Sequence, residues 1–221
     1  MTIISKLFEN SREKLTIFLP SVRSNKIFPY YPRINWSDFF SDEFDILYVA
    51  DSNQNDDFFL EPGGSWFFNR DGTSNIYQIA DYIREISSRK QYREIILYGS
   101  SMGGYAALVL GSIIPDVVVV AECPQIFLRL HPGSLYVINN VNIADDYLLD
   151  LTEIIENKMI AKEVNFVCNS SDHHFSAHLL PLIKMPPSEK RRRFFIYSDR
   201  TYPNGHSALR LEDASKIIRS Y

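Results

Sequence analysis

The sequence has few cysteines, no long apolar run and no excess of positive charge. Its two cysteines, Cys123 and Cys168, are too few for a disulfide framework or a structural zinc cluster. No stretch approaches the roughly 20 apolar residues that span a bilayer. Acidic residues outnumber basic ones by 27 to 23, and the net charge of −4 gives no general attraction to nucleic acid or to an anionic membrane. We therefore expect no nucleic-acid partner and no membrane insertion.

The beginning of the sequence does not resemble a targeting segment. A secretory signal combines a basic start with an apolar run of about 7 to 15 residues. Here polar residues such as Lys6, Glu9 and Arg12 interrupt the early apolar residues, so we expect a cytoplasmic location. The sequence also lacks the glycine fingerprint of dinucleotide-binding folds and the lysine of a P-loop. No nucleotide cofactor is therefore expected.

Length and composition are those of an ordinary globular domain. The 221 residues are enough for one sizeable core, and 45% of them are hydrophobic and 23% charged. No internal repeat and no low-complexity linker divides the chain. We predict a single domain over residues 1–221.

Short apolar runs alternate with helical patterns along the chain. The runs lack polar alternation, which is typical of parallel strands buried on both faces. The pattern predicts an α/β fold, with a doubly wound, mainly parallel sheet of about six strands flanked by helices. The predicted strands are Leu15–Leu19, Phe44–Ala50, Glu94–Tyr98, Val117–Ala121, Val164–Cys168 and Phe194–Tyr197. The main predicted helices are Ser74–Arg89, Gly103–Ile113, His174–Ile183 and Ser207–Ser220.

A G-x-S-x-G motif lies between one of these strands and the helix that follows it. The motif is Gly99-Ser100-Ser101-Met102-Gly103, and the spacing of its glycines selects Ser101 over Ser100. A serine on so sharp a turn is held clear of the sheet, and the flanking glycines avoid clashes there. The Met102 amide, at the start of the helix, would then face an oxyanion on a substrate carbonyl. We predict that Ser101 is a nucleophile.

A serine nucleophile needs a base, and the base needs an orienting carboxylate. His206 follows the last predicted strand in a Pro-Asn-Gly turn and is the predicted base. Asp172 ends the preceding strand and is the favoured acid, because the chain order serine, acid, histidine then holds. Asp199 at the end of the last strand and Glu122, which follows the strand after the nucleophile, stay open as rivals.

A metal site is not expected. His173, His174 and His178 lie close in sequence, and histidines four residues apart share a helix face. No Glu-x-x-His pattern and no cysteine partner accompanies them, so we interpret them as a polar loop and helix start beside the acid.

With Gly99–Gly103, Asp172 and Gly205-His206, the chain resembles the α/β-hydrolase superfamily from the Leu15 strand to the C-terminal helix. The resemblance implies serine hydrolase chemistry on esters, thioesters or amides, with Ser101 as nucleophile, His206 as base and Asp172 as acid. Some members are acyltransferases, and some have lost catalysis. The chain departs from the family in lacking a His-Gly-Gly-Gly oxyanion loop. The corresponding loop is Pro20–Asn25, so the second oxyanion amide is assigned to Val22 or its neighbours in Ser21–Arg23.

These residues predict a cofactor-independent serine hydrolase that cleaves a small-molecule carboxylic ester through an acyl-enzyme. Two alternatives stay open: an acyltransferase that passes the acyl group to a sugar or amine, and a binding module without turnover.

Two aromatic segments follow strands near the nucleophile and are expected to line the entrance of the site. They are Phe28–Trp36 and Phe58–Phe68, and we expect Arg23, Tyr30 and Trp66 to contact the substrate. Aromatic faces beside polar groups such as Arg33, Asn35, Asn69 and Arg70 suit a polar substrate with a short acyl group, for example an acylated sugar.

The longest interruption between predicted strands covers residues 126–160 and includes a predicted helix from Tyr147 to Met159. It is either a small insertion near the active-site edge or a long crossover with one helix.

Overall fold

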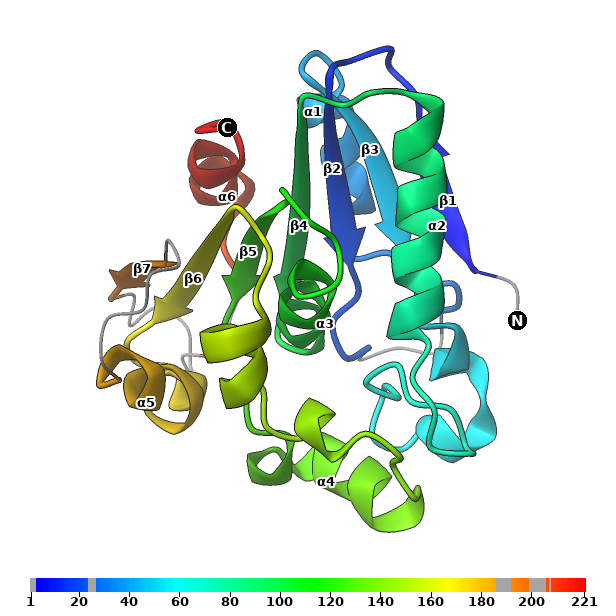
Figure 1. The fold of residues 1–221 in the computed structure, drawn as a ribbon, viewed down its shortest axis with the longest axis vertical. Helices are drawn as coiled ribbons and strands as arrows, with labels where there is room; N and C mark the ends of the chain where they lie inside the picture. The colour runs from blue at the N-terminus through cyan, green and yellow to red at the C-terminus, as the bar shows by residue number, and fades with distance from the viewer. Residues whose placement is uncertain (1–2, 24–26, 186–191, 199–205, 207) are drawn as a thin grey trace.

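The computed structural model describes residues 3–23, 27–185, 192–198, 206 and 208–221 (Figure 1). A seven-stranded sheet forms its centre, in the order β1-β3-β2-β4-β5-β6-β7. Strand β1 is antiparallel to β3, and all other neighbours are parallel. The strands are β1 Ser5–Phe8, β2 Lys14–Leu19, β3 Phe44–Val49, β4 Glu94–Ser100, β5 Val118–Glu122, β6 Glu163–Asn169 and β7 Arg192–Tyr197.

Helices cover both faces of the sheet (Figure 1). Helices α2 and α3 pack on one face, and α1 and α6 pack on the other. The helices are α1 Ser37–Phe40, α2 Ile76–Arg89, α3 Met102–Gly111, α4 Pro132–Asn140, α5 Leu180–Ile183 and α6 Leu211–Ile218. No helix of the described residues is long and apolar enough to cross a membrane.

The strands have no polar alternation because each of their faces meets a hydrophobic core. In β2, Leu15 and Ile17 belong to the core under α2 and α3, whereas Phe18 belongs to the core under α1 and α6. Side chains alternate between the faces of a strand, so a strand buried on both sides is apolar throughout. All six residues of β3 are buried. The predicted doubly wound α/β fold is confirmed.

The sheet has one more strand than predicted. β1 is only four residues long and partly exposed at the sheet edge, so its sequence carries little strand signal. It pairs Ser5–Phe8 with the outer side of β3.

Only the second half of the predicted Tyr147–Met159 helix is helical, over residues 152–158. The chain there forms a 3-10 turn at Asp146–Leu148 and a π-helix at Ile154–Lys158. Between them, the Leu151 amide donates to the Ile126 carbonyl, and Phe127 and Asp150 form a β-bridge. This pairing takes the backbone groups that a continuous helix would need.

The 126–160 stretch packs against the loop that joins β3 to α2. Helix α4 lies beyond the carboxyl ends of the parallel strands (Figure 1). The Ala144 amide donates to the Gly72 carbonyl, and the indole of Trp66 lies against Gly133. The stretch is therefore at the sheet edge where ligands of open α/β sheets bind.

Candidate active site

Ser101 occupies a strained turn between β4 and α3. Its φ and ψ angles are 55° and −114°, a region that side chains other than glycine's rarely adopt. A Cβ on Gly99 would lie 2.0 Å from the Gly103 carbonyl oxygen, and a Cβ on Gly103 would lie 2.7 Å from the Leu19 carbonyl oxygen. Both motif glycines are thus required by close backbone contact. The turn is the strand–serine–helix elbow that the sequence predicts.

The surrounding backbone fixes this turn. The Ser101 amide donates to the Glu122 carbonyl at 2.8 Å, and its carbonyl accepts from the Tyr105 amide at 3.0 Å. The Ser101 hydroxyl is the acceptor of a 3.1 Å hydrogen bond from Nε2 of Gln125. Only 6% of the Ser101 surface is exposed, so a substrate must bring its carbonyl into a closed site.

The predicted oxyanion groups lie on two sides of the elbow. Met102 is the first residue of α3, so its amide has no partner within the helix. The loop after β2 passes close to Gly103, whose Cβ position is 3.0 Å from the Pro20 carbonyl oxygen. In that loop the Arg23 amide is already bonded to the Gly63 carbonyl at 2.9 Å. This leaves the amides of Ser21 and Val22 as candidates for the second donor.

The side chain of Gln54 holds the predicted oxyanion loop in place. Its Nε2 donates to the Ser21 carbonyl at 3.0 Å and to the Gly63 carbonyl at 3.1 Å. Gln54 is fully buried, so water does not compete for these two hydrogen bonds to the loop.

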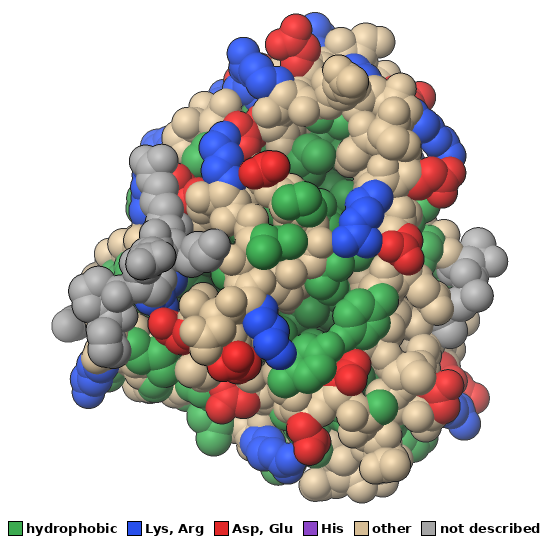
Figure 2. All heavy atoms as spheres, viewed as in Figure 1, with side chains coloured by type: hydrophobic (Ala, Val, Ile, Leu, Met, Phe, Trp, Pro, Cys, Tyr) green, Lys and Arg blue, Asp and Glu red, His purple; other side chains and the backbone are tan. Residues whose placement is uncertain are grey.

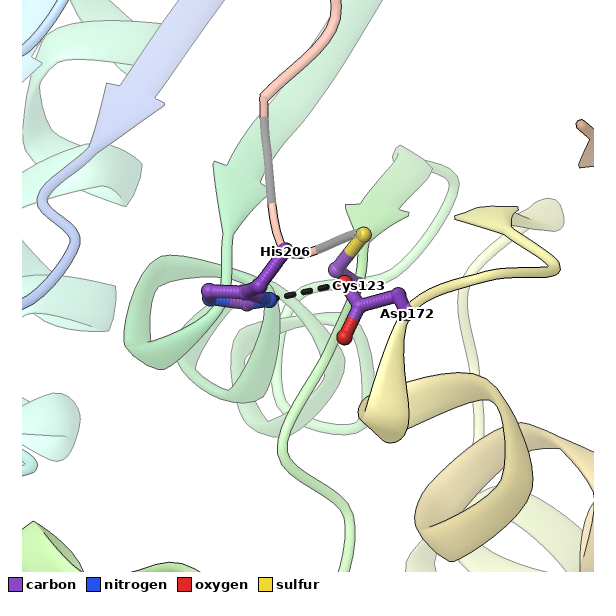
Figure 3. A group of neighbouring side chains, drawn as sticks. All are labelled: Cys123, Asp172 and His206. Carbon is purple, nitrogen blue, oxygen red and sulfur yellow. Dashed lines mark hydrogen bonds and ion pairs between the residues drawn. The ribbon is translucent and has the colours of Figure 1, made fainter. Parts of the chain in front are cut away.

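Asp172 and His206 form a direct pair at the end of β6 (Figure 3). Oδ2 of Asp172 lies 2.7 Å from Nδ1 of His206. Oδ1 of Asp172 accepts from the His174 amide at 2.8 Å, which holds the carboxylate in place. The Asp172 side chain is fully buried, and 32% of the His206 side chain is exposed. The structure thus brings together the predicted acid and the predicted base.

The pair favours its charged form. Burial alone would raise the pKa of Asp172, but hydrogen bonds from His206 and the His174 amide lower it to about 2. Burial alone would lower the pKa of His206, but its bonds to Asp172 and Cys123 raise it to about 10. The contact with Asp172 therefore favours a proton on His206, and the ring acts as a base only in its neutral form.

Glu122, a rival for the acid, has other partners. It is fully buried and accepts from Arg33 Nη2 at 2.8 Å and from the Tyr98 hydroxyl at 2.8 Å. It also accepts from the Leu209 amide. The other rival, Asp199, lies outside the described residues, as do Gly205, Ser207 and the Ser24–Asn25 end of the expected oxyanion loop.

The other histidines gather around the pair. The ring centroids of His174 and His206 are 4.2 Å apart, and those of His174 and His178 are 4.9 Å apart. Nδ1 of His174 bonds the Cys123 carbonyl at 2.9 Å. Burial, followed by the charge of His206, lowers the pKa of His174 to about 3, and burial lowers the pKa of His178 to about 4. These two rings are therefore neutral neighbours of the pair.

Cys123 lies beside the pair, and no motif in the sequence marks it as part of the site. The donor atoms of Cys123, Asp172 and His206 are within 4.8 Å of one another (Figure 3), and Asp172, His173 and His174 form an overlapping group. Thiolate, imidazole and carboxylate are zinc-type ligands, so these described residues are the ones that could hold such an ion. The short Asp172–His206 bond, however, directs two of the donors at each other.

A cavity of about 470 Å³ adjoins the elbow. Aromatic rings and one guanidinium line it, together with Ser100, which precedes Ser101, and residues shortly after His206. Its lining includes Ser21, Tyr30, Tyr31, Arg33, Trp36, Ser100 and Leu209. Tyr30 and the Tyr31–Trp36 part of the aromatic segment thus line a cavity that touches Ser100, whereas Ser101, Asp172 and His206 are not among its lining residues.

The second aromatic segment does not line this cavity. The core buries the side chains of Trp66, Phe67 and Phe68. The prediction that these aromatic rings line the entrance and that Trp66 contacts the substrate is therefore wrong. Arg70, which was expected at the entrance, instead forms an ion pair with Asp56. Arg23 is 6% exposed, and its Nη1 has no partner among the described residues.

A separate hollow lies on the face covered by α2 and α3. Figure 2 shows hydrophobic side chains lining a depression on this face, with charged groups around it. A cavity of about 250 Å³ is lined by residues that include Tyr77, Val109, Ile113 and Tyr147. Val109 belongs to the last turns of α3, at the opposite end from Ser101. This cavity is not part of the candidate site.

The sheet order, the elbow at Ser101 and the Asp172–His206 pair define an α/β-hydrolase-like fold. The capsule O-acetyltransferase of Neisseria meningitidis serogroup A is similar to the chain with a TM-score of 0.65 and 20% identity, over 94% of this chain and 86% of that one. Esterase B from Lactobacillus rhamnosis is similar with a TM-score of 0.65 and 14% identity, over 96% and 76%. The S-formylglutathione hydrolase from Agrobacterium tumefaciens is similar with a TM-score of 0.59 and 13% identity, over 93% and 83%. No protein-family model and no curated protein sequence matches the chain.

Proposed function

We propose that this protein is a serine hydrolase that cleaves a carboxylic ester through an acyl-enzyme. One observation carries the proposal: Asp172 orients His206 at the same sheet edge where the strained turn presents Ser101. The turn is energetically unfavourable for a serine, and such strain is a hallmark of functional sites. The likeness in fold to esterases and to an O-acetyltransferase supports the same chemistry.

In the proposed reaction, Ser101 Oγ attacks the substrate carbonyl carbon while Nε2 of His206 takes the hydroxyl proton. The amides of Met102 and Val22 stabilise the resulting oxyanion. The carbon–oxygen bond to the alcohol then breaks, and His206 returns the proton to the departing alcohol oxygen. Water repeats the sequence on the acyl-enzyme and releases the carboxylic acid. No step needs a cofactor.

The proposed substrate is a small polar ester with a short acyl group, such as an acylated sugar. Tyr30, Tyr31 and Trp36 offer ring faces to the cavity beside the elbow, and Arg33 lies among them. Sugars bind in such sites by stacking on rings and by hydrogen bonds to polar groups. Arg23 is the further candidate for a polar contact with the substrate. A cytoplasmic location stays a prediction of the sequence.

Acyl transfer is the second candidate function. It is favoured by the fold likeness to a protein described as a capsule O-acetyltransferase. A sugar hydroxyl or an amine would then take the place of water in the second half-reaction, with the same three side chains.

Labelling with a fluorophosphonate tests the proposal. Wild type and Ser100→Ala should label, whereas Ser101→Ala should not and should lose turnover of acetyl esters by several orders of magnitude. Ser100 is the matched control, because its hydroxyl is adjacent but outside the glycine spacing. Equal labelling of Ser101→Ala would overturn the assignment. Product analysis with a sugar acceptor present distinguishes hydrolysis from transfer.

A further inference from the structure

Gln125 is a fully buried amide that contacts the nucleophile. It follows the end of β5 by three residues, and its Nε2 lies 3.1 Å from Ser101 Oγ. Its Oε1 accepts a hydrogen bond from Nε1 of Trp66. Neither end of this amide is exposed to solvent, and neither residue belongs to the serine–acid–histidine set.

The orientation of the amide follows from chemistry. An indole N–H can only donate, so the atom of Gln125 that faces Trp66 must be the carbonyl oxygen. The NH₂ group therefore faces Ser101, and the serine oxygen is the acceptor.

Trp66 is itself held firmly. Its ring is fully buried, and the Cβ position of Gly133 lies 2.7 Å from it. The preceding residue, Ser65, donates its amide at 2.9 Å and its hydroxyl at 2.7 Å to the buried carboxylate of Asp51. A serine hydroxyl that accepts from this fixed amide has its own hydrogen free to point elsewhere.

We propose that Gln125 is a further catalytic residue, which donates a hydrogen bond from Nε2 to Ser101 Oγ during the reaction. The inference rests on the proposed function, because it gives Ser101 the role of nucleophile. The bond fixes the Oγ rotamer and leaves the hydroxyl proton for His206. When the acyl-enzyme breaks down, Oγ leaves with developing negative charge, and the same N–H stabilises it. Gln125 donates this bond without transferring its own proton.

Gln125→Glu is the decisive variant. A glutamate keeps the shape and still accepts from Trp66, but an ionised carboxylate cannot donate to Oγ. We expect kcat to fall by about 100- to 1,000-fold, as for loss of one oxyanion donor. KM should stay within about threefold, because the lost bond is to the nucleophile and not to the substrate.

Trp66→Phe gives a second, independent test. It keeps a large ring but removes the donor that sets the direction of the amide, so kcat should fall about tenfold through misoriented Gln125. Tyr105→Phe is the control, since it removes a buried hydroxyl that has no partner among the described residues and should keep wild-type kcat.

Two outcomes are distinguishable. If Ser101→Ala is inactive while a folded Gln125→Glu keeps kcat within twofold, the proposed function stands and the role of Gln125 is overturned. If Ser101→Ala keeps its activity, the proposed function itself fails. Should Gln125→Glu not fold, an unchanged kcat in Trp66→Phe overturns the role of Gln125.

Discussion

Glu122 accepts a hydrogen bond from the backbone amide of Leu209, three residues beyond His206. Its other carboxylate oxygen accepts from Arg33 and Tyr98. One buried carboxylate therefore joins the segment after His206 to the aromatic loop that lines the cavity. Glu122, a rival for the acid in the sequence, therefore has a structural role, because it links these two segments.

Loss of the Glu122 charge should cost stability. In Glu122→Gln, the guanidinium of Arg33, whose side chain is 9% exposed, would keep its charge without a counterion. Removing one partner of a buried ion pair costs about 3 to 5 kcal/mol, so the free energy of unfolding should fall by about 3 kcal/mol. Denaturant unfolding measures this, with the exposed Glu85→Gln as control, for which a change below about 0.5 kcal/mol is expected. Equal stability of the two variants would contradict this structural role of Glu122.

Asp172→Asn should lower kcat by about three to four decades, because the imidazole loses the partner that orients it. It should also move the pH profile. Asp172 and Cys123 together outweigh burial and raise the pKa of His206 to about 10, so wild-type kcat/KM should climb into the alkaline range as His206 becomes neutral. In the variant the His206 pKa falls, and the residual activity should level off at lower pH. A pH–rate profile unchanged in shape would contradict the pairing.

Stability should depend on pH through the same pair. The pKa of Asp172 is lowered to about 2, so its contribution is present above its unfolded value of 3.8 and is lost as pH falls towards 2. The pKa of His206 is raised from 6.5 to about 10, so its contribution is present below 6.5 and is lost as pH rises towards 10. The pair should stabilise the fold most between about pH 4 and 6.5. The difference in unfolding free energy between wild type and His206→Ala should therefore narrow outside that window.

Ser101→Gly should be more stable than Ser101→Ala. The φ angle of 55° strains any residue with a Cβ, and glycine removes that strain. We expect a difference of about 1 kcal/mol in unfolding free energy, with both variants inactive. Calorimetry on the two purified proteins checks the order, and a less stable glycine variant would show that the turn is unstrained.

Acyl-chain preference tests the proposed substrate. Acetyl to butyryl esters should react faster than esters with chains beyond about eight carbons, because the cavity beside the elbow combines rings with polar groups. The measurement is kcat/KM over a graded ester series. A steady climb with chain length would favour a lipase-like or thioesterase role.

Local patterns were sufficient to predict the elbow and the buried strands. The glycines around Ser101 are needed by contacts within a few residues, and strands covered on both faces need apolar residues throughout. The pairing of Asp172 with His206 could be predicted as well, because the chain order of the resembling family places such a carboxylate and histidine after successive strands.

Tertiary contacts decided what the sequence could not predict. Gln125 meets Ser101 only through the arrangement of β4 and β5, and no spacing marks it. Trp66 was expected at the entrance, but its ring is buried and its Nε1–H donates to Oε1 of Gln125. Cys123 has a φ of 40°, and this backbone conformation places its sulfur beside the pair. Such positions depend on the turn after a strand, which residue type alone does not fix.

Ser101, Gln125, Asp172 and His206 follow β4, β5, β6 and β7 in turn, and these strands are consecutive neighbours in the sheet. Strand spacing of about 4.8 Å therefore sets their lateral separation, and the pairing of Ser100 with Glu122 and of Glu122 with Val167 sets their height. A slip of one residue along either ladder would shift Asp172 relative to Ser101 by about 3.3 Å, more than a hydrogen bond can span. The register of the backbone hydrogen bonds between these strands thus sets the relative positions of the site residues. Catalytic activity would therefore depend on the correct register of β4, β5, β6 and β7, including strands that carry no reacting atom.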